Sequence, residues 1–251
     1  MEVISSSQNP RIKAWKKLQK KKERDRSGLF LIEGEHLIEE ALKASLTVKQ
    51  IICSEGRGIP REWTVSGIEV VEVTEQVLAD LAETETPQGM IAVCVKPQLK
   101  NIVFDSGKYL LLDRVQDPGN LGSLFRTSEA AGMTGVILGE GCADPFNPKV
   151  IRATQGALFH IPIQSMDLED ALQYCHESGI PVFGTSLNGS TYSAIEPQES
   201  FALLMGNEGS GVDPDLLAKT DQNLYIPLHG KSESLNVGVA AGILVYHLSG
   251  H

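Results

Sequence analysis

The second half of the chain alternates short apolar segments with helical stretches, and this pattern constrains the fold more than any other feature. Strands are expected at YLLLD (109–113), GVILG (135–139), IPVFGTS (180–186), FALLMG (201–206) and NLYIPL (223–228). Helices are expected between and after them, at 121–131, 148–159, 168–178, 214–219 and 237–248. Such alternation favours a parallel sheet covered by helices on both faces. We therefore expect an α/β domain over residues 109–251.

A smaller α/β domain is expected ahead of it, over residues 28–95. Its strands are predicted at 28–34, 48–54, 68–73 and 89–95, with helices at 35–44 and after Thr74. Residues 96–108 contain proline and polar side chains with little periodicity, which is typical of a linker. Residues 1–27 are expected to form a separate basic helix or arm.

Charge is distributed very unevenly along the chain. The net charge is −10, yet residues 1–26 carry nine basic and three acidic side chains, or +6, which leaves −16 on the remainder. This asymmetry predicts an N-terminal arm attracted to phosphate. The alternative is a helix, running from Asn9-Pro10 to Ser27-Gly28, that packs on the body through Ile12, Trp15 and Leu18. Charge alone does not distinguish the two.

Several classes of protein are excluded by missing patterns. No apolar run approaches the roughly 18 residues of a membrane span, and the start lacks a secretory signal, so we expect a cytoplasmic protein. The cysteines and histidines show no metal-ligand spacing. Gly230-Lys231-Ser232 lacks the earlier glycine of a P-loop, since that position holds Tyr225, and neither GxGxxG nor GxSxG marks a cofactor-binding or nucleophile turn.

Three segments follow predicted strands, where ligands bind in parallel sheets. In 113–133, Asn120 is expected to cap the next helix, which places Arg126 about two turns into it. In 203–217, three glycines around Glu208 let the backbone approach a ligand. In 225–250, Ser234 or Asn236 is expected to cap the helix that begins near Val237. Taken alone, each segment also has a purely structural explanation. Asn120, Ser234 and Asn236 could be ordinary helix caps, Arg126 a solvent-exposed arginine, and the loop around Glu208 a flexible connection from a strand to a helix.

Together, DPGNLGSLFRT, GNEGSG and IPLHGKSESLNV closely resemble the three motifs of the SpoU (TrmH-like) family of RNA ribose methyltransferases, in the SPOUT class. Residues 28–95, with FLIEGEHLIEEAL, resemble the substrate-binding domain often found ahead of that catalytic domain, an α/β fold shared with certain ribosomal proteins. The resemblance implies a deep C-terminal trefoil knot. It also implies S-adenosylmethionine bound in the knot, and a homodimer that contacts RNA across both subunits.

The resemblance also assigns residues to roles. The candidate catalytic residues are Asn120, Arg126, Glu208, Ser234 and Asn236. The cofactor would be held mainly by backbone groups of Gly206, Ile226, Leu228 and Leu235, with Thr185 and Ser186 lining the pocket. Two departures from the family pattern are visible. Gly238 stands where serine is usual, and Thr154-Gln155 stands where serine followed by methionine or alanine is common.

The expected reaction is S-adenosylmethionine-dependent methylation of a ribose 2′-hydroxyl. The family assigns the base role to the arginine matching Arg126, but a guanidinium is almost wholly protonated at neutral pH. We therefore expect Arg126 to clamp the phosphate and ribose, with Glu208 and Asn120 positioning it or the ribose. Ribosomal RNA is favoured as substrate because relatives with the added N-terminal domain use it. The alternatives are a transfer RNA 2′-O-methyltransferase and a catalytically inert RNA-binding factor of ribosome assembly; the presence of all five motif residues favours an enzyme.

Overall fold

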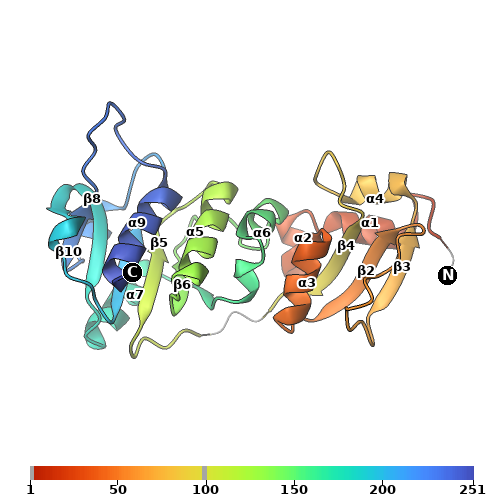
Figure 1. The fold of residues 1–251 in the computed structure, drawn as a ribbon, viewed down its shortest axis with the longest axis horizontal. Helices are drawn as coiled ribbons and strands as arrows, with labels where there is room; N and C mark the ends of the chain where they lie inside the picture. Colours follow the sequence, from red (N-terminus) through yellow and green to blue (C-terminus); the bar gives the residue numbers. More distant parts are fainter. Residues whose placement is uncertain (1–2, 98–100) are drawn as a thin grey trace. The chain divides into compact units, whose positions relative to one another are not determined.

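The computed structural model describes residues 3–97 and 101–251 (Figure 1). Its contacts divide the chain into two compact units, each described here by itself. The N-terminal unit is Met1–Gln98 with Asp144–Phe159, and the C-terminal unit is Leu99–Ala143 with His160–His251. A segment from the second half of the sequence therefore completes the N-terminal unit. The sequence pattern gave no indication that residues 144–159 belong to the N-terminal unit. The domain boundaries expected at 27, 95 and 108 stay predictions.

The N-terminal unit is built on a four-stranded mixed sheet. Its strands are β1 (Leu29–Glu33), β2 (Val48–Ser54), β3 (Glu69–Val73) and β4 (Met90–Val95), in the order β1-β4-β2-β3. Strand β4 is antiparallel to β1 and β2, whereas β2 and β3 are parallel. The four expected strands are confirmed, each within one residue of its predicted bounds.

Helices cover both faces of this sheet because strand residues alternate between faces. On one face, α1 (Pro10–Lys17) and α4 (Glu75–Leu81) share an apolar cluster with Leu31 of β1. On the other, α3 (Glu35–Lys43) and α6 (Pro148–Thr154) lie against β1, and the ring of Phe30 stands 5.0 Å from that of Phe146. A 3-10 turn, η1 (Ala157–Phe159), ends the inserted segment.

The basic N-terminal stretch forms two helices rather than the single one expected. Asn9 caps α1, and α2 (Lys21–Ser27) ends at Gly28 with φ +66°. Ile12, Trp15 and Leu18 are buried against the sheet. The packing alternative is therefore confirmed for one face of α1.

A buried ion pair joins α2 to the inserted segment. Arg24 is only 2% exposed, and its Nη2 lies 2.6 Å from Oδ2 of Asp144. Its Nη1 donates to the carbonyl oxygens of Leu18 and Gln19, at 2.9 and 2.8 Å. A buried guanidinium is tolerated only when it is paired and hydrogen-bonded in this way. Arg24 thus connects the end of α1, helix α2 and the approach to α6.

The C-terminal unit contains a six-stranded sheet in which every neighbouring pair is parallel. The order is β10-β8-β9-β5-β6-β7, with β5 (Lys108–Leu112), β6 (Gly135–Leu138), β7 (Ile163–Ser165), β8 (Val182–Thr191), β9 (Phe201–Met205) and β10 (Gln222–Tyr225). The parallel sheet is as expected. Strand β7 was not predicted, because three residues are too few to show a period.

Helices flank this sheet, but the one predicted at 148–159 was wrongly assigned to it and lies in the N-terminal unit as α6 and η1. Helices α7 (Leu168–Glu177) and α8 (Pro214–Leu217) pack on the face that carries Tyr109 and Leu111 of β5. Helices α5 (Pro118–Ala130) and α9 (Val237–Ser249) pack against each other, and α9 contacts β9 and the 3-10 turn η2 (Tyr192–Ala194) (Figure 1). Among the described residues, no helix is long and apolar enough to cross a membrane.

Small side chains let α5 and α9 approach closely. A Cβ added to Gly238 would lie 3.1 Å from the Cβ of Ser123, which is tighter than ordinary packing. One turn further along, a Cβ on Gly242 would lie 3.9 Å from Thr127. The glycine at 238, which departs from the family's usual serine, therefore suits the close approach of these two helices.

Replacing Asp144 with alanine should destabilise the N-terminal unit strongly. The substitution leaves Arg24 buried without its counter-charge, which costs about 3–5 kcal/mol in the free energy of unfolding. Urea titration followed by tryptophan fluorescence reports on this unit, because the two tryptophans of the chain, Trp15 and Trp63, both lie in it.

The matched control is Glu39→Ala. Glu39 pairs with Lys43 on the exposed side of α3, and such surface pairs contribute less than about 1 kcal/mol. Equal losses in the two variants would contradict a structural role for the buried pair.

Candidate functional site

The three segments singled out in the sequence follow β5, β9 and β10. These strands and β8 lie side by side and parallel, so their carboxyl ends share one edge of the sheet. In such sheets this edge is where ligands bind. Asn120, Glu208 and Asn236 are brought into contact here, although they lie far apart in the sequence.

A chain of hydrogen bonds connects these three side chains. Nδ2 of Asn236 donates to Oδ1 of Asn120 at 2.7 Å. Nδ2 of Asn120 then donates to Oε1 of Glu208 at 3.1 Å, and the same oxygen accepts from the backbone N–H of Asp117 at 3.1 Å. Each amide both donates and accepts, so one orientation of each amide satisfies the whole network.

At the Asn236 end, the network is fixed by backbone N–H groups. Oδ1 of Asn236 accepts from the N–H groups of Gly238 and Val239, at 2.9 and 3.3 Å, which confirms Asn236 as the cap of α9. This leaves its Nδ2 free to face Asn120. Capping and network formation therefore use opposite ends of the same amide.

The expected cap at Asn120 was wrong. Asp117 caps α5, accepting from the N–H of Asn120 at 2.8 Å, and Pro118 occupies the first helical turn. Proline suits that position because its φ is already helical and it has no N–H to satisfy. The shift by three residues places Asn120 inside the helix and leaves its side chain available to Glu208.

Glu208 is held as a carboxylate. Partial removal from water raises its pKa, but hydrogen bonds from its own backbone N–H, the Asn120 amide and the N–H groups of Asp117 and Gln116 outweigh this effect. The net result is a pKa below the ordinary value for glutamate. Glu208 is thus ionised at neutral pH and serves as a hydrogen-bond acceptor, not as a proton donor.

A buried carboxylate ties two of the site segments together. Asp113 follows β5, is 5% exposed, and accepts from Nε and Nη2 of Arg114, both at 2.9 Å. Its Oδ2 also accepts from the backbone N–H of Asp213, beyond β9, at 2.8 Å. Arg114 has a left-handed backbone, with φ +53°, which is uncommon for a residue with a side chain.

Asn207 adds a second tie between the same segments. Its Nδ2 donates to the carbonyl oxygen of Arg114 at 2.8 Å, while its Oδ1 accepts from the N–H groups of Gly209 and Ser210. Asn207 therefore shapes the loop that carries Glu208. Sequence reasoning missed Asp113, Arg114 and Asn207, whose signal was a polar residue directly after a buried strand or directly beside Glu208.

Gly206 is required by the same loop. A Cβ at this position would lie 2.1 Å from the backbone nitrogen of Val212, closer than any side chain permits. The loop closes on itself through paired backbone hydrogen bonds between Asn207 and Gly211. Glycine here is a matter of packing within the loop.

Arg126 and Ser234 lie outside the network. Both are exposed, and neither side chain makes a hydrogen bond or ion pair within residues 3–97 and 101–251. The structure thus joins three of the five candidate catalytic residues and leaves one cation and one hydroxyl open to a ligand.

The candidate cofactor residues come from the ends of β8, β9 and β10. Pairing of β10 shifts from Gly184 to Ser190 of β8, so the intervening residues, which include Thr185 and Ser186, leave the ladder. Oγ1 of Thr185 donates to the carbonyl of Leu204 at 3.0 Å, which anchors this excursion to β9. Within the described residues, no group of histidine, cysteine and acidic side chains could hold a metal ion.

Half-buried and exposed apolar side chains lie along this edge. Ile226 and Leu228 follow β10 and are half-buried, and Leu235 is 37% exposed. Among the described residues, the backbone groups of Gly206, Leu228 and Leu235 take part in no backbone–backbone hydrogen bond outside helices and strands. An apolar rim of this kind suits a ligand that has a flat ring.

Comparison with known proteins identifies the family. The model of the SpoU rRNA Methylase family matches residues 107–246, and that of the MRM3-like substrate binding domain matches residues 9–92. A Bacillus subtilis (strain 168) relative, named 23S rRNA (guanosine(2553)-2'-O)-methyltransferase RlmP, is 50% identical over 251 residues, covering 100% of both chains.

Solved structures agree. An AdoMet-bound rRNA methyltransferase from Sinorhizobium meliloti superposes with a TM-score of 0.89 at 33% identity, covering 100% of this chain and 98% of that one. The SpoU methyltransferase AviRb from Streptomyces viridochromogenes, in complex with AdoMet, gives 0.84 at 26% identity, with 96% and 97% covered. The expected fold class and cofactor are confirmed. The chain therefore belongs to the SpoU rRNA methylase family of S-adenosylmethionine-dependent methyltransferases.

Proposed function

We propose that this protein methylates the ribose 2′-hydroxyl of a guanosine in 23S ribosomal RNA. The observation that carries the proposal is the Asn236–Asn120–Glu208 network at the carboxyl ends of the parallel strands. The name of the Bacillus subtilis relative, which is similar along the whole chain, supports the choice of RNA and nucleotide. The 2′-oxygen forms a bond to the methyl carbon as the carbon–sulfur bond breaks, and the hydroxyl proton is released.

The cofactor supplies a methyl group made electrophilic by a positively charged sulfur. Backbone groups of Gly206, Ile226, Leu228 and Leu235 would hold it, with Thr185 and Ser186 lining the pocket. The trefoil knot expected from the family would bring these segments together. The groups at the strand ends fit such a ligand, since the apolar rim suits the adenine ring.

The chain's own residues fall into two groups: those that would contact the substrate and those that position them. Arg126, an exposed cation whose side chain has no partner among the described residues, would bind the phosphate and ribose of the target nucleotide. The side chains of Asn120, Glu208 and Asn236 act as positioning residues that fix α5, which carries Arg126. The open hydroxyl of Ser234 would contact the substrate or the cofactor. Holding the 2′-oxygen in line with the methyl group is the main contribution of such a site.

The protein would act as a homodimer in the cytoplasm, where its RNA substrate is found. Val239 and Tyr246 of α9 are 53% and 40% exposed, and a spacing of seven residues puts them on one side of the helix. A second copy covering this stripe would remove large apolar side chains from water. RNA would then be contacted across both subunits, as the family resemblance implies.

Labelled methyl transfer from S-adenosylmethionine to unmethylated 23S ribosomal RNA tests the function. Digestion to nucleosides should yield 2′-O-methylguanosine. Arg126→Lys should bind the cofactor normally but lose turnover by about 10²–10³-fold, because an ammonium cannot reproduce the planar fork of donors. Methyl transfer only to transfer RNA would contradict ribosomal RNA as the substrate. Near-normal turnover of the Arg126→Lys variant would contradict the role of Arg126 in binding the target nucleotide. Cofactor binding without transfer to any RNA would favour the inert assembly factor.

Glu208→Gln should lower turnover on the order of 100-fold through misplacement of α5, without moving the pH profile between pH 5 and 9. Because the pKa of Glu208 lies below the ordinary value for glutamate, the carboxylate stays ionised throughout this pH range and is lost only at more acidic pH. An inflection near neutrality that disappears in the variant would instead make Glu208 a proton acceptor.

Tyr246→Asp should convert the dimer to a monomer, because it places a charge inside the proposed apolar interface. Light scattering should then give the single-chain mass of 27.2 kDa, against about twice that for the wild type. Val103→Asp is the matched control, since Val103 is 71% exposed in the same unit but does not lie on α9. A wild-type protein of single-chain mass would contradict the dimer.

A further inference from the structure

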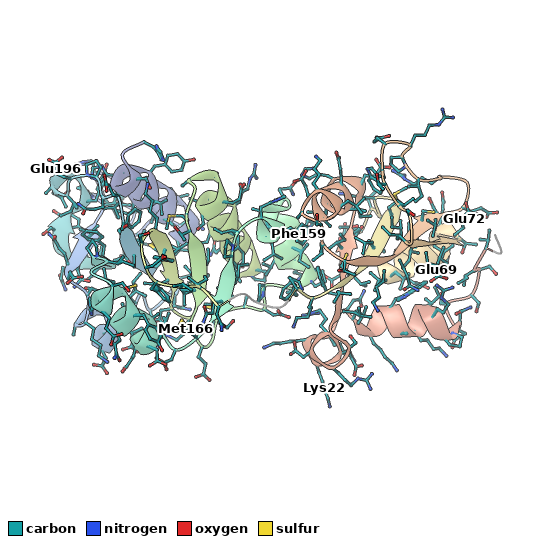
Figure 2. The ribbon with its side chains drawn as sticks, turned by 90° about the horizontal axis from the view of Figure 1, so that it is seen from below. Lys22, Glu69, Glu72, Phe159, Met166 and Glu196 are labelled. Atoms are coloured by element: carbon teal, nitrogen blue, oxygen red, sulfur yellow. The ribbon has the colours of Figure 1, made fainter. Side chains whose placement is uncertain are left out.

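Six lysines form an exposed basic surface on the first two helices of the chain. The lysine surface comprises Lys13, Lys16, Lys17, Lys20, Lys21 and Lys22, all exposed. Lys13, Lys16 and Lys17 share one side of α1, at spacings of three and four residues, opposite the buried Ile12 and Trp15. The side chain of Lys22 projects from α2 away from the unit (Figure 2).

Four acidic side chains that contact this stretch or lie in it are paired with other cations. The ion pairs are Arg11 with Glu69 at 2.8 Å, Arg24 with Asp144 at 2.6 Å, Arg26 with Glu23 at 2.5 Å and Lys96 with Asp25 at 2.7 Å. Within the part of the chain that the structure describes, none of the six lysines makes an ion pair. The arginines of this stretch are used in ion pairs within the protein, whereas the six lysines are left outside them.

This arrangement costs stability unless a ligand offsets it. Lys13 and Lys17 stand four residues apart on α1, and like charges at this spacing repel on a helix. The remainder of the chain is strongly acidic, so the charge is concentrated rather than spread. Because Ile12 and Trp15 anchor α1 to the sheet and Arg24 ties α2 to Asp144, the six ammonium groups are presented from a fixed scaffold, not from a free arm.

We infer that the lysine surface binds the phosphate backbone of the substrate RNA, without reading its sequence. This inference rests on the proposed function for the choice of RNA. Lysine acts toward phosphate as a point charge, whereas arginine supplies the paired donors that recognise a base edge. The surface therefore supplies affinity and orientation, while choice of the nucleotide rests with the C-terminal unit.

The test is the salt dependence of binding to unmodified 23S ribosomal RNA made by transcription. Each phosphate contact contributes about 0.7–0.9 to the slope of log K against log salt, so the double variant Lys17→Gln/Lys20→Gln should flatten the slope by about 1.4–1.8. Replacing all six lysines with glutamine should flatten it by about 4–5. Turnover at saturating RNA should stay unchanged in the double variant, with only the KM for RNA raised.

The control variant is Lys49→Gln/Lys149→Gln, which removes two exposed lysines elsewhere in the N-terminal unit. Trp15 fluorescence and the urea midpoint verify folding, and glutamine keeps nearly the helix propensity of lysine. A slope change equal to that of the control would overturn the inference. So would lysine-dependent binding to phosphatidylserine vesicles without any effect on RNA.

Failure of the proposed function would be visible separately. The slope is measured by binding, so it needs no methyl transfer. A lysine-dependent slope in a protein that methylates no RNA would support the surface and count against the enzyme.

Discussion

The carboxylate of Asp113 is the interaction on which the site depends. A charge buried this deeply persists only when it is paired, and Asp113 is satisfied by the guanidinium of Arg114 and the N–H of Asp213. These bonds join the end of β5 to the segment after β9, and Asn207 repeats the link through the carbonyl of Arg114. Glu208 follows Asn207 directly, so its position relative to α5 depends on the buried charge that holds these two segments together.

Local pattern predicted much of the C-terminal fold and little of the geometry of its site. Apolar segments such as FALLMG identify buried strands, and their alternation with helices implies parallel order. A three-residue strand such as β7 carries no period, and the cap was misplaced because Asn120 and Asp117 are both good caps; the proline after Asp117 decided between them. The contact of Asn120 with Glu208 depends on two loops meeting, which no local spacing encodes.

The N-terminal stretch shows why two hypotheses drawn from one sequence need not exclude each other. A helix has a period near 3.6 residues, so α1 can bury Ile12 and Trp15 while presenting Lys13, Lys16 and Lys17 to solvent. The amino-acid composition of this stretch shows its positive charge but not which side chains are buried. The burial of Arg24 was equally hidden, because its partner Asp144 lies 120 residues away in the sequence.

The inserted segment also affects the order in which the protein is made. Domains generally fold as units during synthesis, from the N-terminus onward. Here the sheet of the N-terminal unit emerges early, but Asp144, Phe146 and α6 follow only after β5, α5 and β6 of the other unit. Until then, Arg24 has no counter-charge and Phe30 has no ring against it. The N-terminal unit therefore cannot complete its folding until part of the C-terminal unit has been synthesised. Meanwhile the apolar face of its sheet stays incompletely covered while the ribosome translates the intervening strands.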